Sequence, residues 1–264
     1  MKSASLAASI FAFGMSNAMA SDVTVREFTS ALHAATPGQP IDFSNRDLSY
    51  LDLSNLNFGA ARLARSDLFG TDMTDANLKN VSLIGARLDR TTIIRANFSG
   101  ADLSGATMMV PAAFIDPITA VAEAPKFTGA TLVRFRVTGV YWQVDFRGAD
   151  LTDADFSPHA KRFGDTTVNE PLRTAVRSCD FSGARLVRAN LRRLLAHFTV
   201  FAGADLTDAN LSEADLSKAD LSGANLTGAQ LFGANFDGAI LRGVQGLKDA
   251  KDVAHALNLD KAVR

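Results

Sequence analysis

The feature that most constrains this chain is a large apolar residue at every fifth position. One unbroken register runs from Phe43 to Met108, and another runs from Phe181 to Leu241. Ala lies two residues before many of these positions, for example at Ala76. A period of five matches neither the α-helix, with about 3.6 residues per turn, nor the β-strand, with about two. The backbone must therefore turn once in each repeat.

If each repeat forms one side of a square coil, four repeats close a turn, and the large apolar residues and the alanines all point inward. Successive coils then stack at the inter-strand spacing of about 4.8 Å, with their backbone groups paired along the stack. Leu78, Leu103 and Leu221 are expected in this core. Cys179 occupies one of the alanine positions, so we expect it to be a small buried side chain rather than a reactive thiol.

The repeats also have a recognisable sequence. Ala76-Asn77-Leu78, Ala101-Asp102-Leu103 and Ala219-Asp220-Leu221-Ser222-Gly223 resemble the A(D/N)LXX unit of the pentapeptide repeat family. The resemblance implies an all-β fold, a right-handed quadrilateral β-helix, which agrees with the square coil. It implies little about the task of the protein, because function belongs to sites placed on the fold.

Both ends of such a solenoid need a cover for their apolar core. Two segments also interrupt the repeat. Helical spacing of apolar residues in 24–35 and again in 247–257 predicts short N- and C-terminal capping helices. Prolines in 109–126 and in 157–173 predict inserted loops, because proline cannot continue strand pairing. A slip of one residue in the register is expected between Trp142 and Phe146.

The predicted organisation follows from these signals. It comprises a signal peptide at 1–20, an N-terminal capping helix at 21–40, a repeat block at 41–108, a loop at 109–126, a repeat block at 127–156 that contains the slip, a loop at 157–173, a repeat block at 174–243 and a C-terminal capping helix at 244–264.

The first twenty residues have the pattern of an export signal. Lys2 precedes an apolar stretch that is too short to span a bilayer, and Ala18-Met19-Ala20 forms an A-x-A cleavage site. We expect cleavage after Ala20, a periplasmic or secreted protein, and no transmembrane segment in the mature chain. The alternative is a disordered or helical N-terminus of a cytosolic protein.

No motif indicates catalysis, so no catalytic, cofactor-binding or metal-binding residue is predicted. The four histidines lack metal-ligand spacing, and no nucleophile or phosphate-binding signature occurs. Acidic residues such as Asp52 and Asp72 should stack on one face, which leaves a β-helical glycan-active enzyme as an alternative. These positions vary freely among Asp, Asn, Arg and Ser, which favours a protein without catalysis.

The most distinctive predicted surface is a central arginine belt. The chain has a net charge of −1, but residues 134–193 contain 11 basic and 7 acidic residues. The belt is interpreted either as a docking patch for an acidic protein or an anionic surface, or as arginines that pair with aspartates across coils. Nucleic acid is not expected as a partner. Tyr141 and Trp142 either form a contact point or fill the defect beside the slip. The candidate partner-binding residues are Arg134, Arg136, Arg147, Arg185, Arg188, Arg192, Arg193, Tyr141 and Trp142.

We therefore interpret the chain as an exported binding or scaffold protein with an unidentified partner. The resemblance implies one further alternative, because well-known members of the family present an acidic, duplex-like rod to DNA gyrase. The near-neutral net charge and the arginine belt argue against such mimicry. Some relatives also dimerise through their C-terminal end, so a homodimer formed in this way is another implied alternative.

Overall fold

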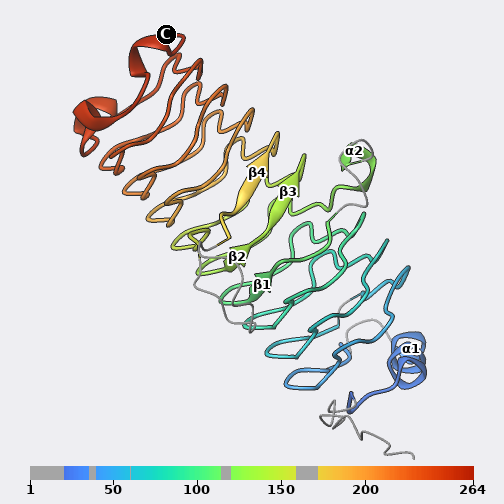
Figure 1. Cartoon of the computed structure of the whole chain (residues 1–264). Coiled ribbons are helices and arrows are strands. Elements are labelled where there is room, and N and C mark those ends of the chain that lie inside the picture. Colours follow the sequence, from blue (N-terminus) through green and yellow to red (C-terminus); the bar gives the residue numbers. More distant parts are fainter. Residues whose placement is uncertain (1–20, 36–39, 60, 114–119, 159–171) are drawn as a thin grey trace, which may run out of the picture.

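The chain winds into a column of stacked coils, with its N-terminal segment at one end and its C-terminus at the other (Figure 1). The computed structural model describes residues 21–35, 40–59, 61–113, 120–158 and 172–264. The predicted signal peptide lies outside these residues, as do 114–119 and 159–171 within the two predicted loops.

The regular elements are short because each side of a coil is short. The helices are α1 (Val25–Ala34), α2 (Ala120–Glu123) and the 3-10 helices η1 (Leu247–Asp249), η2 (Val253–His255) and η3 (Leu259–Lys261). Strand β1 (Thr107–Met109) pairs in parallel with β2 (Arg136–Thr138), and β3 (Val140–Trp142) pairs in parallel with β4 (Ala175–Arg177). Elsewhere, single bridged residues form the parallel ladders.

These ladders define four faces of the column. Face I begins with Asp42 paired to Arg62, face II with Asp47 paired to Asp67, face III with Asp52 paired to Asp72, and face IV with Asn57 paired to Asn77. Partners lie twenty residues apart, so each coil contains four repeats, as predicted. We name the two-residue corner between neighbouring faces an edge, such as edge II/III. The second residue of a corner usually has a positive φ.

The core runs along the whole column and is made of the residues at the five-residue period. Leu78, Leu103 and Leu221 are fully buried, which confirms their predicted orientation. Cys179 is also fully buried, and this burial raises the pKa of its thiol to about 12. The prediction that it is an inert small side chain is thereby confirmed. A file of nearly parallel phenylalanine rings, with centroids 4.6 to 5.2 Å apart, joins Phe98, Phe127, Phe146, Phe181 and Phe201.

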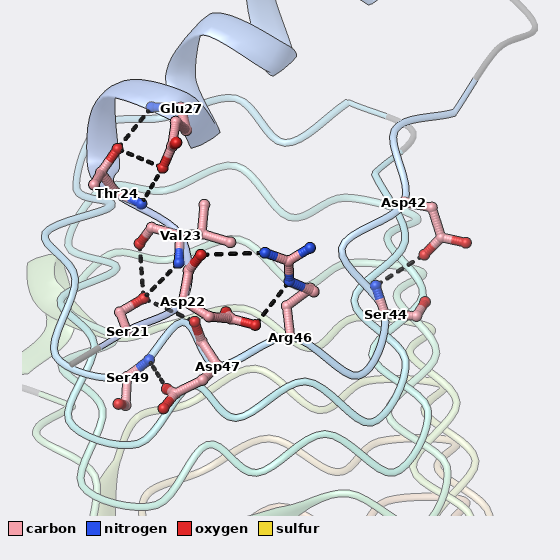
Figure 2. Close-up of polar contacts among 10 residues, drawn as sticks. All are labelled: Ser21, Asp22, Val23, Thr24, Glu27, Asp42, Ser44, Arg46, Asp47 and Ser49. Carbon is pink, nitrogen blue, oxygen red and sulfur yellow. Dashed lines mark hydrogen bonds and ion pairs between the residues drawn. The ribbon is translucent and has the colours of Figure 1, made fainter. Parts of the chain in front are cut away.

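The N-terminal end is closed as predicted. Thr24 and Glu27 form a capping box that starts α1, and Phe28 is buried with its ring centroid 4.4 Å from that of Phe43. The preceding residues pack against the first coil (Figure 2): the Ser21 hydroxyl donates to the Asp47 carbonyl oxygen at 2.7 Å. Arg46 Nε donates to Asp22 Oδ2 at 2.9 Å. The helix therefore covers the apolar end of the column.

The C-terminal end corrects the expected helical stripe. Gln245, Lys251, Leu257 and Val263 remain in the four ladders but lie six residues apart, and η1, η2 and η3 lie between them. The chain thus adds one wider coil, because a sixth residue on each side gives room for a 3-10 turn. Leu257 is 53% exposed rather than part of a buried stripe. The core-facing side chains are Leu247, Ala250, Val253, Ala256, Leu259 and Ala262.

The slip in register lies earlier than predicted. Tyr141 is in register with the buried Val176 and is itself 1% exposed, so the core position belongs to Tyr141 and not to Trp142. Gly139 makes the shortened corner with a φ of 141°, in the region that favours glycine. The missing residue therefore falls between Val137 and Tyr141, and it moves Trp142 out to the surface.

The first interruption also begins later than expected. β1 extends to Met109, and Ala112 still pairs with Thr92 on face III. Pro111 is tolerated because it follows the corner at a position whose N–H bonds within its own coil, as Ala106 N does to Leu103 O, and is therefore not needed by the ladder. The next ladder position, on face IV, is Lys126, which pairs with Asn97. The first insertion thus leaves the column at edge III/IV, and α2 protrudes there from its side (Figure 1).

Candidate binding surface

The predicted arginine belt does not form one surface. Arg147 lies at edge IV/I, Arg185 on face I, Arg134 and Arg188 at edge I/II, Arg136 on face II, and Arg192 and Arg193 at edge II/III; these positions follow from the ladders. A flat partner could therefore contact only part of the belt at one time.

Ion pairs between coils hold several belt arginines. Arg188 binds Asp153 through two contacts of 2.7 Å, and these hydrogen bonds lower the pKa of Asp153. Arg147 lies 2.7 Å from Asp145 and 3.7 Å from Asp180. The ladder thus brings arginines and aspartates of successive coils together, as in the second interpretation of the belt.

Glu213 holds the arginine pair at edge II/III. Its Oε1 lies 2.5 Å from Arg192, its Oε2 lies 3.6 Å from Arg193, and the hydrogen bond from Arg192 lowers the pKa of the carboxyl group. A shallow hollow of about 220 Å³ lies beside this pair and is lined by Ser157, Pro158, Asn190, Arg192, Arg193 and Asn210.

Three belt arginines make no ion pair with any residue that the structure describes. They are Arg134, Arg136 and Arg185. One coil lies between the coil of Arg134 and Arg136 and the coil of Arg185. In that coil, Asp150 is the ladder neighbour of Arg185, and Asp155 is the ladder neighbour of Arg136. On faces I and II, the charges of Arg185 and Arg136 are therefore balanced by an aspartate in the adjacent coil.

The two aromatic candidates have different positions. Tyr141 is buried, and its hydroxyl lies 3.5 Å from the carbonyl oxygen of Met108, so the predicted contact role for Tyr141 is wrong. Its ring fills the space left by the shortened coil. Trp142 is half-buried on the surface, with the Arg177 guanidinium carbon 5.9 Å from its ring centroid.

The acidic ladders give little support for catalysis or for a duplex-like rod. On face III, hydrogen bonds from the Ser54 side chain and backbone lower the pKa of Asp52, whereas a general acid needs a raised pKa. Asp47 and Asp67 are followed on face II by Arg87, and Asp52 and Asp72 are followed on face III by Thr92. Acidic runs in the described ladders therefore end after two coils.

Exposed apolar side chains gather on face III and its two edges. The sequence analysis did not predict this cluster, although the sequence shows apolar residues at outward positions of the repeat. Val140 and Leu257 lie on the face, Phe198 lies at edge III/IV, and the remainder lie at edge II/III, namely Tyr50, Val110, Leu172 and Phe232. Large exposed apolar residues away from this side are Val25, Ile84 and Val263.

Both insertions also border face III. The first lies between Ala112 on face III and Lys126 on face IV, and the second lies between Asp155 on face II and Ala175 on face III. Insertions on a rigid scaffold and exposed apolar patches both mark interaction sites. Face III between Val110 and Phe198 is therefore the candidate binding surface.

Two further properties of the described residues bear on function. None of the helices there is long and apolar enough to cross a bilayer. The same residues contain no group of His, Cys, Asp and Glu side chains arranged to hold a metal ion.

Comparisons with known proteins identify the repeat. A family model for pentapeptide repeats matches eight copies, in residues 71–108, 177–212 and 204–243. Among curated proteins, none matches the chain in sequence.

Solved structures of repeat proteins are also similar. HetL from the cyanobacterium Nostoc, a pentapeptide repeat protein involved in heterocyst differentiation regulation, is 27% identical, with 87% of this chain and 94% of HetL covered at a TM-score of 0.36. QnrB1, a plasmid-mediated fluoroquinolone resistance protein, is 19% identical, with 73% and 88% covered at a TM-score of 0.31. The repeats and the four-faced column lead to one conclusion: the chain carries pentapeptide repeats and folds as a right-handed quadrilateral β-helix.

Proposed function

We propose that this protein is an exported, non-catalytic binding protein that holds an anionic partner against face III. The observation that carries the proposal is the concentration of exposed apolar side chains on that face and its edges, between the two insertions. The column supports such a role because its continuous core and ladders hold the surface rigid, and rigid surfaces lose little conformational entropy on binding.

The charge around face III favours an anionic partner over a neutral one. Arg177, at edge III/IV, is exposed and forms no ion pair with a residue that the structure describes, whereas Arg192, at edge II/III, is held by Glu213. An acidic protein or an anionic surface would meet Arg177 while its apolar groups cover Val140 and Leu172. In this proposal the belt contributes only the residues that border face III, whereas Arg134 lies at edge I/II, away from this face.

Export is proposed from the signal-peptide pattern of residues 1–20, and the contacts of the residues that follow are compatible with cleavage there. Ser21 and Asp22 already pack against the first coil through Asp47 and Arg46. Cleavage after Ala20 would preserve these contacts, and α1 would still cover the end of the column. Cell fractionation with N-terminal sequencing tests this step: an N-terminus at Ser21 in an exported fraction supports it, and an intact N-terminus in the cytoplasm contradicts it.

Site-specific photo-crosslinking in cells tests the binding surface. A photoreactive residue at Leu172 should give a discrete cross-linked product, whereas the same residue at Ile84, an exposed apolar position at edge I/II, should not. Equal products at both positions, or no product with either protein or lipid at Leu172, would remove face III as the binding surface.

A homodimer through the C-terminal end is a second proposal, carried by the last coil. Its inward side chains, including Val253 and Leu259, pack against the core but are only partly buried, because no further coil covers them. A second copy placed end to end would cover this apolar surface. Analytical ultracentrifugation should then show a dimer that Leu259→Lys converts to a monomer, and a wild-type monomer at all concentrations would refute the proposal.

A further inference from the structure

Edge III/IV carries aromatic and cationic side chains on four successive coils. Trp142 pairs in register with Arg177, and the ladder continues from Ala175 to Leu195 and Asp215. Ser178 N donates to His197 O, and Phe198 N donates to Ser217 O, so the corners of these coils are stacked. We name the four residues Trp142, Arg177, Phe198 and Lys218 the aromatic–cationic ridge.

Phe198 is the most unusual member of the ridge. Its side chain is 63% exposed, and its φ is 57°, a conformation that bulky residues adopt at a cost in free energy. The equivalent corner residues in the neighbouring coils are Ser178 and Lys218. A strained phenylalanine that is more than half exposed contributes little packing to the fold, so its presence points to a contact outside the column.

The ridge is also positively charged. Arg177 and Lys218 are exposed, and neither forms an ion pair with a residue in the described part of the chain. Nearby acidic groups are already engaged: His197 lies 2.8 Å from Asp215, and Arg147 lies 3.7 Å from Asp180. Asp237 lies one coil beyond Lys218, at the end of the ridge.

The shape of the ridge distinguishes among anionic partners. It is a convex edge, so its side chains protrude, and the aliphatic Val140 lies beside it on face III. A folded protein partner would need a groove that matches this edge, and a glycan would leave the aliphatic residues exposed to water. A bilayer interface adapts to a convex edge, takes up tryptophan and phenylalanine at headgroup depth, and attracts cations when its lipids are anionic.

We propose that the aromatic–cationic ridge docks this protein on an anionic phospholipid membrane. The proposal rests on the proposed function in that it names the partner of face III. Phe198 and Trp142 enter the interface, Arg177 and Lys218 contact lipid phosphates, and the coils that carry the ridge, which follow the α2 insertion at the same edge, lie against the surface without spanning it.

Vesicle binding by the mature chain tests the proposal, with Trp142 as the reporter because it is the single tryptophan of the protein. Vesicles of phosphatidylcholine and phosphatidylglycerol should shift its fluorescence to the blue and carry the protein in flotation, and high salt should weaken both effects. Vesicles of phosphatidylcholine alone should bind much more weakly. No shift and no flotation with anionic vesicles would overturn the proposal.

Matched variants locate the contact. Arg177→Gln with Lys218→Gln should weaken binding by about fivefold for each charge removed. Phe198→Gly should weaken it by about tenfold, and this variant should still fold because glycine relieves the positive φ. Arg134→Gln with Arg136→Gln removes the same charge from the opposite side, and Ile84→Ser removes an exposed apolar group at edge I/II.

The controls decide between docking by the ridge and general attraction. Unchanged binding by both controls supports the ridge, whereas equal losses in the control and ridge variants would overturn it. If vesicles fail to bind while a photoreactive residue at Leu172 still cross-links to a protein, membrane docking is wrong and the proposed function stands. If both fail, the proposed function falls as well.

Discussion

The repeat block at 174–243 and the central coils at 107–158 are built from the same five-residue unit, yet they differ in regularity. In the later block the ladder advances twenty residues at each step, as from Asp205 to Asn225. In the central coils the step from Thr131 to Asp150 is one residue shorter, and both insertions lie there. The regular block therefore keeps one constant register, whereas the central coils change the register between the blocks on either side of them.

Different forces hold these two regions together. The regular block relies on the consensus alanine and leucine core and on corner residues such as Gly203, with a φ of 64°. A file of phenylalanine rings passes through the central coils at Phe127 and Phe146 and continues to Phe98 on one side and to Phe181 and Phe201 in the regular block on the other. We infer that stacked rings bridge the coils whose lengths differ, because large apolar groups bury more area at each step than leucine does.

The largest expected effect comes from removing a ring from this file. Phe146→Ala should lower the free energy of unfolding by about 4 kcal/mol, because the neighbouring coils cannot close around the cavity. Leu211→Ala in the regular block is the comparison, with an expected loss of about 3 kcal/mol. Urea unfolding followed by circular dichroism measures both. A loss for Phe146→Ala that is clearly smaller than for Leu211→Ala would contradict the bridging role.

The shortened corner should be the next most sensitive position. A Cβ on Gly139 would lie 3.2 Å from Pro111 Cδ and 3.5 Å from the Val110 Cα, and its φ is 141°. Gly139→Ala should therefore cost about 2 to 3 kcal/mol in unfolding free energy. Gly203→Ala in the regular block has no neighbour within 4 Å of the new Cβ and should cost only about 1 kcal/mol. Equal losses would show that the slip imposes no special constraint.

A surface substitution should act in the opposite direction. Phe198→Gly is expected to raise the unfolding free energy by about 1 kcal/mol, because glycine adopts the positive φ of this corner without strain. Phe232→Gly is the comparison, since this exposed phenylalanine precedes Gly233, which already supplies the positive φ. Thermal melts of the two variants measure the difference. A lower melting temperature for Phe198→Gly would show that the ring contributes to the fold.

The smallest expected effect concerns acid sensitivity. Burial raises the pKa of Asp145, but hydrogen bonds from Arg147 and Thr128 outweigh it and leave the pKa lowered. The ionised carboxylate therefore stabilises the fold above the pKa of the unfolded state, near 4, and this contribution is lost as the pH falls through the lower folded pKa.

Asp145→Asn should flatten the decline of stability below about pH 4. Asp215→Asn is the comparison in the regular block, where burial raises the pKa but bonds from Ser217 and the charge of His197 lower it overall. Unfolding midpoints measured across this range test both variants. An unchanged acid profile for Asp145→Asn would show that its ion pair contributes nothing.

The fold could be predicted in detail, whereas the binding surface could not. The period of five identified the core down to Cys179, because only one side of each repeat can face the narrow interior. The slip was misplaced, since Tyr141 and Trp142 are both large enough to fill the core and only the pairing of Tyr141 with Val176 decides between them. The C-terminal coil was mistaken for a helix, although Leu247, Val253 and Leu259 recur with a period of six.

The ion pairs of the belt arginines could not be predicted from the sequence either. Arg188 and Asp153 are 35 residues apart in the chain, and only the coil lengths place them in contact. The sequence by itself determined the square coil, its core and the outward position of the variable residues, because a short repeat imposes one geometry on every copy. The tertiary structure alone decided which outward residues of distant coils meet on one face, because insertions and a one-residue deletion shift the register between them. Charge neutralisation on faces I and II, and the gathering of apolar groups on face III, both follow from that register.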